Sequence, residues 1–186
     1  SIMRSIPNMV VLNPADGVEA RLCVLKAAEY DGPVYIRLGR SNVPVIFDEN
    51  YTFEIGKGVE LKSGKDVTII ATGIMVAKAL EASEMLSEEG ISARVINIST
   101  IKPIDKDIII KAAKETKGIV TAEEHSIIGG LGSAVAEVLV ENCPVPMKRV
   151  GVEDTFGESG NGDELLVKYG LTPENIIKNV KSVLSL

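Results

Sequence analysis

Short runs rich in valine and isoleucine alternate along the chain with segments in which apolar residues recur every three or four positions. The runs are typical of buried strands, and the wider spacing is typical of helices that bury one face. The expected strands cover residues 9–12, 34–38, 67–72, 93–98, 119–122 and 148–152. Because strands joined by crossover helices form parallel sheets, the pattern predicts a three-layer α/β/α sandwich with a mostly parallel sheet.

Polar residues indicate where the helices begin. Asp16 with Glu19 three positions later makes a capping box. The expected apolar stripe of the helix that follows is Val18, Leu22, Leu25 and Ala28. Asp105 is expected to cap a second helix, and Thr172 followed by Pro173 is expected to begin the last one.

The periodicity weakens between residues 41 and 65, where proline, glycine and acidic residues are frequent. We therefore place a linker near residues 43–51. The residues before it supply two strands and one helix, which are too few to close a domain. The expected division is an incomplete α/β tail over residues 1–50 and a self-contained domain over residues 51–186.

Composition and charge exclude several classes of protein. Hydrophobic residues make up 45% of the 186 residues, which is enough for a buried core. A formal charge of -6 and the lack of a basic run argue against a nucleic-acid-binding protein. The apolar runs are far shorter than the roughly 20 residues that cross a bilayer. The first eight residues do not have the order of a secretion signal. We expect a cytoplasmic protein without a membrane segment.

A glycine-rich loop precedes one predicted helix and contains Gly129, Gly130 and Gly132. Backbone N–H groups at such a helix end can bind a phosphate. The dinucleotide fingerprint is incomplete, because Val135 stands where a third spaced glycine belongs and no P-loop lysine follows. Close packing of the helix is therefore the better interpretation of this loop.

Glu123, Glu124 and His125 follow a predicted strand, at the edge where open α/β sheets bind ligands. Carboxylates beside an imidazole can exchange protons. Neighbours in an extended segment point to opposite faces, however, so they do not act together on one bond. We interpret the cluster as a polar turn or a subunit contact in which His125 is bonded structurally.

Two other groups of residues are better explained by structural roles than by metal binding or disulfide formation. Asp154, Glu158 and Asp163 lie in a glycine-rich stretch, but they do not meet the EF-hand pattern and fit a solvated acidic loop. Cys23 and Cys143 have neither zinc-ligand nor disulfide spacing, so we expect them to pack in the interior.

Three arginines have different expected roles. Arg40 follows a short apolar strand, whose carboxyl end is the ligand-facing edge of a parallel sheet. A guanidinium there can hold a phosphate through two parallel hydrogen bonds, and a plain surface arginine is the alternative. We interpret Arg4 and Arg37 as members of scaffold ion pairs.

Several motifs resemble the transketolase family in both order and spacing. Those similar to the end of its pyrimidine-binding domain are MRSIPNM at 3–9, PADG at 14–17, DGP at 31–33 and RLGRSN at 37–42. Those similar to its C-terminal domain are TG at 72–73, KPID at 102–105, EEH at 123–125, GGLG at 129–132, FGESG at 156–160, ELL at 164–166 and YGLT at 169–172. The resemblance covers essentially the whole chain.

Related subfamilies share this pair of domains, namely the deoxyxylulose-phosphate synthases and the β subunits of 2-oxo-acid dehydrogenases. The synthases carry proline where Gly39 stands. The order Gly157-x-Ser159-Gly160 is more similar to transketolase, particularly to the form divided between two polypeptides. Both other subfamilies stay open as alternatives.

The resemblance implies transfer of a two-carbon ketol unit between sugar phosphates by thiamine diphosphate, with a divalent metal, Mg or Ca, holding the diphosphate. In the family, the residues that bind the cofactor and metal lie outside the part that this chain resembles, so we assign no catalytic, cofactor-binding or metal-binding residue and expect no bound cofactor here. Arg40 matches the family arginine that binds the sugar-phosphate tail. The implied partners are an N-terminal section or subunit and a second copy in a homodimer.

Two other classes of function stay open. The folded part can be an assembly module that buries apolar surface against partner subunits. It can also be a free-standing nucleotide-binding enzyme, which predicts that the isolated chain binds nucleotides. Because the sequence starts inside a domain, we also expect a truncated or proteolysed chain.

Overall fold

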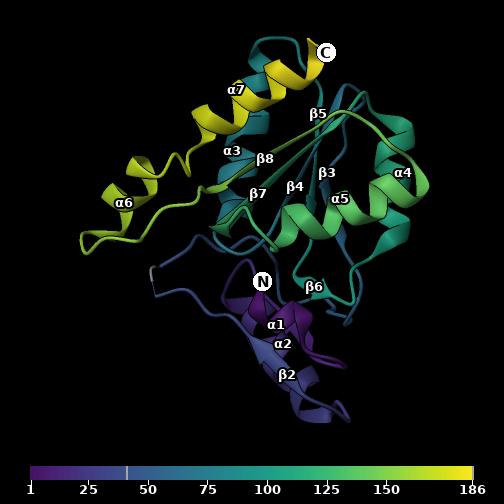
Figure 1. The fold of residues 1–186 in the computed structure, drawn as a ribbon, viewed down its shortest axis with the longest axis vertical. Helices are drawn as coiled ribbons and strands as arrows, with labels where there is room; N and C mark the ends of the chain where they lie inside the picture. Colours follow the sequence, from purple (N-terminus) through teal and green to yellow (C-terminus); the bar gives the residue numbers. More distant parts are fainter. Residues whose placement is uncertain (41, 186) are drawn as a thin grey trace.

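The structure is a computed structural model that describes residues 1–40 and 42–185. Ser41, which belongs to the RLGRSN motif, lies outside the described residues. The described residues form a five-stranded sheet inside a sandwich of helices and a three-stranded sheet below it (Figure 1). The C-terminus lies at the end of the sandwich that is remote from the small sheet.

The large sheet has the strand order β3-β5-β4-β7-β8. Its strands are β3 (Val59–Lys62), β4 (Val67–Ala71), β5 (Ala93–Asn97), β7 (Ile119–Ser126) and β8 (Met147–Val152). Neighbouring strands are parallel, except that β3 at the edge runs antiparallel to β5. The predicted mostly parallel sheet is confirmed.

Helices cover both faces of this sheet (Figure 1). They are α3 (Met75–Glu88) and α7 (Pro173–Leu184) on one face, and α4 (Lys106–Glu115) and α5 (Leu131–Asn142) on the other. Consecutive side chains of a strand point to opposite faces. Ile69 therefore packs under α3 and α7, while Ile70 packs under α4 and α5, and both are fully buried. This arrangement confirms the predicted three-layer sandwich.

The predicted helix caps are present. The Asp105 carboxylate accepts a hydrogen bond from the backbone N–H of Ile108 at 3.3 Å, and the Thr172 hydroxyl accepts one from Asn175 at 3.3 Å. These bonds satisfy N–H groups that have no partner inside the helix. Gly90, with φ of +80°, ends α3 in a left-handed conformation that glycine adopts without strain.

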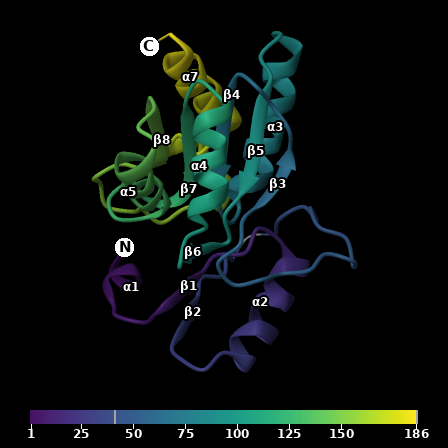
Figure 2. The ribbon, with the colours of Figure 1, turned by 90° about the vertical axis from the view of Figure 1, so that its right-hand side faces the viewer.

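The small sheet has the order β2-β1-β6. Its strands are β1 (Val10–Leu12), β2 (Val34–Ile36) and β6 (Thr100–Lys102), and the neighbouring helices are α1 (Ile2–Ser5) and α2 (Gly17–Glu29). β1 is parallel to β2 and antiparallel to β6. We call α1, β1, α2 and β2 the N-terminal unit. Figure 2 shows this unit below the sandwich, with α2 on its outer side. Because β6 comes from residues 100–102, the small sheet is completed by a strand from outside the incomplete N-terminal tail.

The hydrophobic pattern did not predict β3 or β6. β3 alternates apolar and charged residues over four positions within a segment that we read as irregular. β6 is three residues long and follows β5 closely, with no glycine or proline to separate the two. Strands this short carry too few periods to be recognised without their partners.

The predicted apolar stripe of α2 is wrong in its second half. Leu25 is 50% exposed and Ala28 is also exposed. The buried residues are Glu19 and Cys23, because α2 packs on a small apolar cluster that includes Phe53, while hydrogen bonds satisfy the glutamate. The expected packing role of Cys23 is confirmed, and burial raises the pKa of its thiol to about 12.

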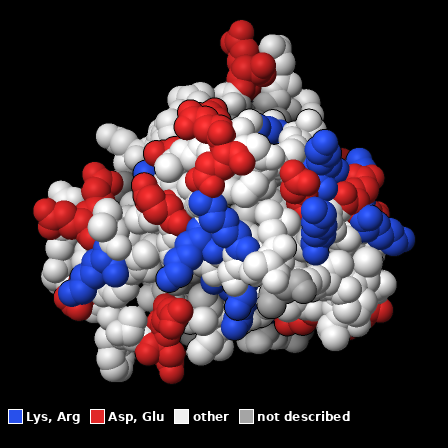
Figure 3. Space-filling view, turned by 90° about the horizontal axis from the view of Figure 1, so that it is seen from above, with Lys and Arg blue, Asp and Glu red and all other residues white. Residues whose placement is uncertain are grey.

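Figure 3 shows separate groups of charged side chains on one end of the molecule, among residues of other types. On that face, lysines and arginines lie beside aspartates and glutamates rather than gathering into one basic surface. The segment that contains α6 (Gly162–Lys168) projects from the sandwich in Figure 1, and Phe156 in the loop before it is 95% exposed. No helix among the described residues has the length and apolar character needed to span a membrane.

Candidate functional site

A cleft lies at the junction between the N-terminal unit and the sandwich. Its polar lining includes Arg4, Asn13, Arg37, Thr72, Glu123 and His125. Three of these residues come from the N-terminal unit and three from the sandwich. Five of the eleven motifs that suggested a family therefore meet here, although they lie far apart in the sequence.

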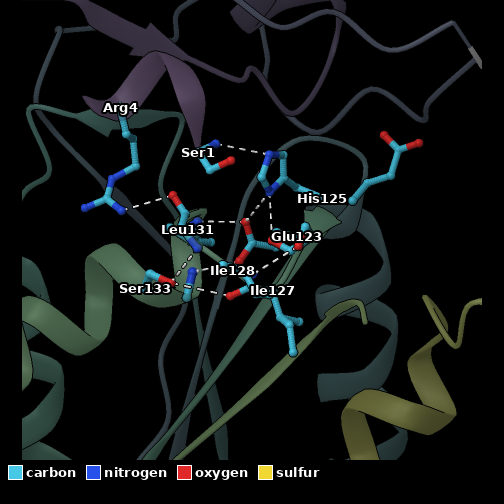
Figure 4. Close-up of polar contacts among 12 residues, drawn as sticks. Ser1, Arg4, Glu123, His125, Ile127, Ile128, Leu131 and Ser133 are labelled. Atoms are coloured by element: carbon cyan, nitrogen blue, oxygen red, sulfur yellow. Dashed lines mark hydrogen bonds and ion pairs between the residues drawn. The ribbon is translucent and has the colours of Figure 1, made fainter. Parts of the chain in front are cut away.

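Glu123 occupies the helix end that the glycine loop presents. Its carboxylate accepts hydrogen bonds from the backbone N–H of Leu131 at 2.7 Å and of Gly132 at 2.8 Å (Figure 4). Burial raises the pKa of Glu123, and the two backbone hydrogen bonds oppose that rise. The anion at the start of α5 is therefore a side chain of the protein itself.

The glycines in this loop allow that close approach. A Cβ at Gly130 would collide with the Glu123 carboxylate. One at Gly132 would lie 2.8 Å from the Arg149 side chain. The expectation that this loop serves helix packing is confirmed by these contacts.

His125 is bonded structurally, as its position suggested. Its Nδ1 lies 2.7 Å from the backbone oxygen of Ser126 and 3.9 Å from the Glu123 carboxylate (Figure 4). Burial lowers the pKa of His125, so the imidazole is neutral at pH 7. A neutral ring that donates from Nδ1 to a carbonyl holds the end of β7 in place.

The two arginines interpreted as scaffold residues form ion pairs. The Arg37 guanidinium donates to the backbone oxygen of Glu124 at 2.8 Å and lies 3.6 Å from its carboxylate. Arg4 lies 2.6 Å from the Glu137 carboxylate and donates to the backbone oxygen of Gly129 at 3.0 Å. Both pairs join the N-terminal unit to the sandwich, so this expectation is confirmed.

Other motif residues also hold the N-terminal unit. Lys102 donates from Nζ to the backbone oxygens of Arg4 at 2.9 Å and Ile6 at 2.6 Å, at the C-terminal end of α1. The Thr72 hydroxyl donates to the backbone oxygen of Asn13 at 3.1 Å. These contacts give the KPID and TG motifs a role in joining the two parts.

Glu19 is a junction residue that the sequence did not reveal. It is fully buried, and its carboxylate accepts hydrogen bonds from Ala15 N–H at 2.7 Å, from the Tyr51 hydroxyl at 2.9 Å and from the Asn97 amide at 2.9 Å. Burial raises its pKa. The sequence showed a capping residue, but its partners lie in the linker and in β5, which no local pattern connects.

Arg40 is exposed in the loop that follows β2. The strand is two residues shorter than predicted, since it ends at Ile36. A Cβ at Gly39 would lie 3.5 Å from the Ile74 side chain, so the loop passes close to the start of α3. The structure therefore places Arg40 at a sheet edge open to solvent, while its binding role stays a prediction.

The acidic residues of the late loop do not form a metal site. The part of the chain that the structure describes contains no group of three or more His, Cys, Asp or Glu side chains able to hold a metal ion. The described residues therefore do not supply the donors for the divalent metal that the resemblance implied. We therefore assign no step of that chemistry to residues of this chain.

Comparison with known families shows to which family the chain belongs. Residues 56–176 match the family described as transketolase, C-terminal domain, and residues 1–45 match transketolase, pyrimidine binding domain. The chain belongs to the transketolase family. It corresponds to the C-terminal section of a split transketolase, with the end of the pyrimidine-binding domain and the C-terminal domain.

Individual relatives agree with this assignment. A 6-deoxy-6-sulfo-D-fructose transketolase subunit from Clostridium sp. (strain MSTE9) is 51% identical over 98% of this chain and 57% of its own length. An apulose-4-phosphate transketolase subunit from Phocaeicola vulgatus is 44% identical over 96% of this chain and 57% of its own length. A solved structure, described as a split gene transketolase, inactive beta4 tetramer, superimposes with a TM-score of 0.97 at 56% identity, covering 100% of this chain and 61% of that one. The chain thus spans little more than half of these relatives.

Proposed function

We propose that this chain is part of a transketolase that transfers a two-carbon ketol unit between sugars with anionic tails, and that Arg40 binds the tail. The observation that carries the proposal is the exposed guanidinium beyond the end of β2 in a chain of this family. Binding a remote anion lets its energy hold the reacting carbon in place, which raises kcat/KM.

The names of two relatives support an anionic tail. One relative is named for a sulfo-sugar and another for a sugar phosphate. A guanidinium holds either group through parallel hydrogen bonds from its planar fork. We propose a tail of this shared chemistry and leave the choice between sulfonate and phosphate to the kinetic test below.

The complete enzyme requires groups from outside these residues. We propose that thiamine diphosphate with a divalent metal is held by an N-terminal section or subunit, and that the assembly is a homodimer of such pairs. We also propose residues 1–50 as the remnant of the pyrimidine-binding domain with its linker, and residues 51–186 as the C-terminal domain. The family matches over residues 1–45 and 56–176 support the domain division, and the word subunit in the names of two relatives supports a separate N-terminal partner.

The test is the substitution Arg40→Ala in the assembled enzyme, formed with the N-terminal partner. We measure kcat/KM for a ketose phosphate, for the corresponding 6-sulfo sugar and for the neutral sugar. A charged hydrogen-bond donor contributes about 1.5–3 kcal/mol, so kcat/KM falls about tenfold to a hundredfold for the preferred anionic sugar. The neutral sugar is used at an unchanged rate.

A matched control is Lys26→Ala, which removes an exposed cation on α2 that pairs with Glu29 at 2.9 Å. It leaves all three rates unchanged. If Arg40→Ala leaves the preference for anionic sugars intact, or lowers the rates with all three sugars equally, the proposed role of Arg40 is wrong.

A second role, assembly, is favoured by one observation. Phe156 is 95% exposed and Val167 is 69% exposed on the projecting segment around α6. Large apolar side chains in such positions are typical of contacts with another subunit. Phe156→Ser should weaken association of the chain with its partner or with a second copy, which sedimentation velocity measures, and unchanged association would exclude this role for the segment.

A further inference from the structure

The segment that carries Arg40 is held at its start by Arg37. The backbone N–H of Arg37 donates to Leu12 at 2.8 Å, which extends the pairing of β2 with β1 by one bond. Its guanidinium donates to the backbone oxygen of Glu124 at 2.8 Å, with the carboxylate 3.6 Å away. Arg40 therefore lies three positions after Arg37, which is bound both to β1 and to Glu124 in the EEH motif of the sandwich.

The same segment is held at its end by Asp16. One carboxylate oxygen, Oδ2, accepts hydrogen bonds from the backbone N–H of Ile46 at 2.7 Å and of Phe47 at 2.8 Å. The other, Oδ1, caps α2 by accepting from Glu19 at 2.8 Å. Asp16 is 3% exposed, so these bonds lie in the interior, where they are stronger than at the surface.

Arg40 thus follows a fixed residue, Arg37, and the described chain is fixed again at Ile46 and Phe47. Ordering a free loop on ligand binding costs conformational entropy, and a loop that is already restrained pays less of that cost. We propose that Arg37 and Asp16 are positioning residues: they hold the Arg40 segment so that its guanidinium meets the anionic tail of the sugar. Through Arg37, the EEH motif of the C-terminal domain contributes to substrate affinity without touching substrate.

This inference rests on the proposed function of Arg40 and is tested in the same assembled enzyme. The variants are Arg37→Met, Asp16→Asn and Glu124→Gln, and the readout is the ratio of kcat/KM for the preferred anionic sugar to that for the neutral sugar. For Arg37→Met and Asp16→Asn the ratio falls about threefold to tenfold, mainly through KM, because restraint on the loop is lost but the guanidinium remains. Glu124→Gln gives a smaller fall, since its backbone oxygen still accepts from Arg37.

A matched control separates positioning from loss of structure. Arg4→Met removes another arginine that lines the junction cleft and pairs with Glu137 at 2.6 Å, but Arg4 does not lie on the Arg40 segment. It leaves the ratio unchanged even if it lowers both rates. If Arg4→Met lowers the ratio as much as Arg37→Met does, general loosening of the junction explains the effect and the inference is wrong.

A double-mutant cycle decides whether Arg37 acts through Arg40. In the Arg40→Ala background, Arg37→Met should cause no further fall in the ratio, because no guanidinium is left to position. A further fall would mean that Arg37 itself binds the anion, which overturns its positioning role. If Arg40→Ala lowers the ratio but Arg37→Met and Asp16→Asn do not, the proposed function stands and this inference fails.

Discussion

The interior of the sandwich is held by apolar packing, whereas the junction beneath it also depends on side-chain hydrogen bonds and ion pairs. Ile69 and Ile70 in β4 are fully buried among apolar side chains from both helical layers. At the junction, Val11 packs into the same apolar cluster as Ile70, and hydrogen bonds from Arg37 and Lys102 add polar contacts. Apolar packing tolerates exchanges of similar volume, whereas a buried carboxylate needs particular donors.

This difference explains where the family motifs lie. The TG, KPID, EEH and GGLG motifs come from the sandwich, yet each makes a contact with the N-terminal unit. The strands of the core are described by their hydrophobicity alone. These four motifs therefore specify how the N-terminal unit is joined to the sandwich, and the periodic pattern specifies the sandwich itself.

The largest expected effect comes from a substitution in the apolar core of the sandwich. Ile70→Ala leaves a cavity under α4 and α5 and lowers the free energy of unfolding by about 2–5 kcal/mol. Chemical denaturation measures this loss, and Ile70→Val, as the control, costs about 0.5–1.5 kcal/mol. A loss below about 1 kcal/mol for the alanine variant would contradict the picture of a tightly packed central strand.

The second prediction concerns the buried carboxylate of Glu123, which lines the junction cleft. Because burial raises the pKa of Glu123 in the folded state, that state binds more protons than the unfolded state at pH values above the usual glutamate range. The stability that this group contributes is therefore greatest at low pH and falls as the pH rises to its folded pKa. A single group changes the free energy of unfolding by at most about 1.4 kcal/mol per pH unit.

Glu123→Gln removes that titration. Unfolding free energies measured between pH 4.5 and 7 should show a less negative slope for the variant than for the natural chain. Parallel curves for the natural chain and Glu123→Gln would show that the carboxylate titrates normally.

The smallest expected effect concerns Lys102. Lys102→Met removes two donated hydrogen bonds to the C-terminal end of α1, which costs about 1 kcal/mol locally. Amide hydrogen exchange should speed up in β1 and leave β4 unchanged, because the loss opens the junction and not the core. Equal acceleration in both strands would mean that the two regions unfold as one unit.

The sequence predicted the sandwich better than the junction. The parallel strands and the caps at Asp105 and Thr172 follow from local periodicity and side-chain chemistry, and the structure confirms them. The stripe on α2 was displaced because the pattern cannot show that three hydrogen-bond donors allow Glu19 to be buried. Strands β3 and β6 were missed because each is recognised by its pairing and not by its own residues.

The sequence by itself determined the layer architecture, the family and the candidate anion-binding residue Arg40, because each depends on neighbouring positions or on short motifs. The tertiary structure alone decided what those motifs contact. The bond between Arg37 and Glu124 joins positions 87 residues apart, and that between Arg4 and Gly129 joins positions 125 residues apart. No local pattern encodes such pairs, because they form when the closing of the sandwich brings the ends of separate strands to one edge.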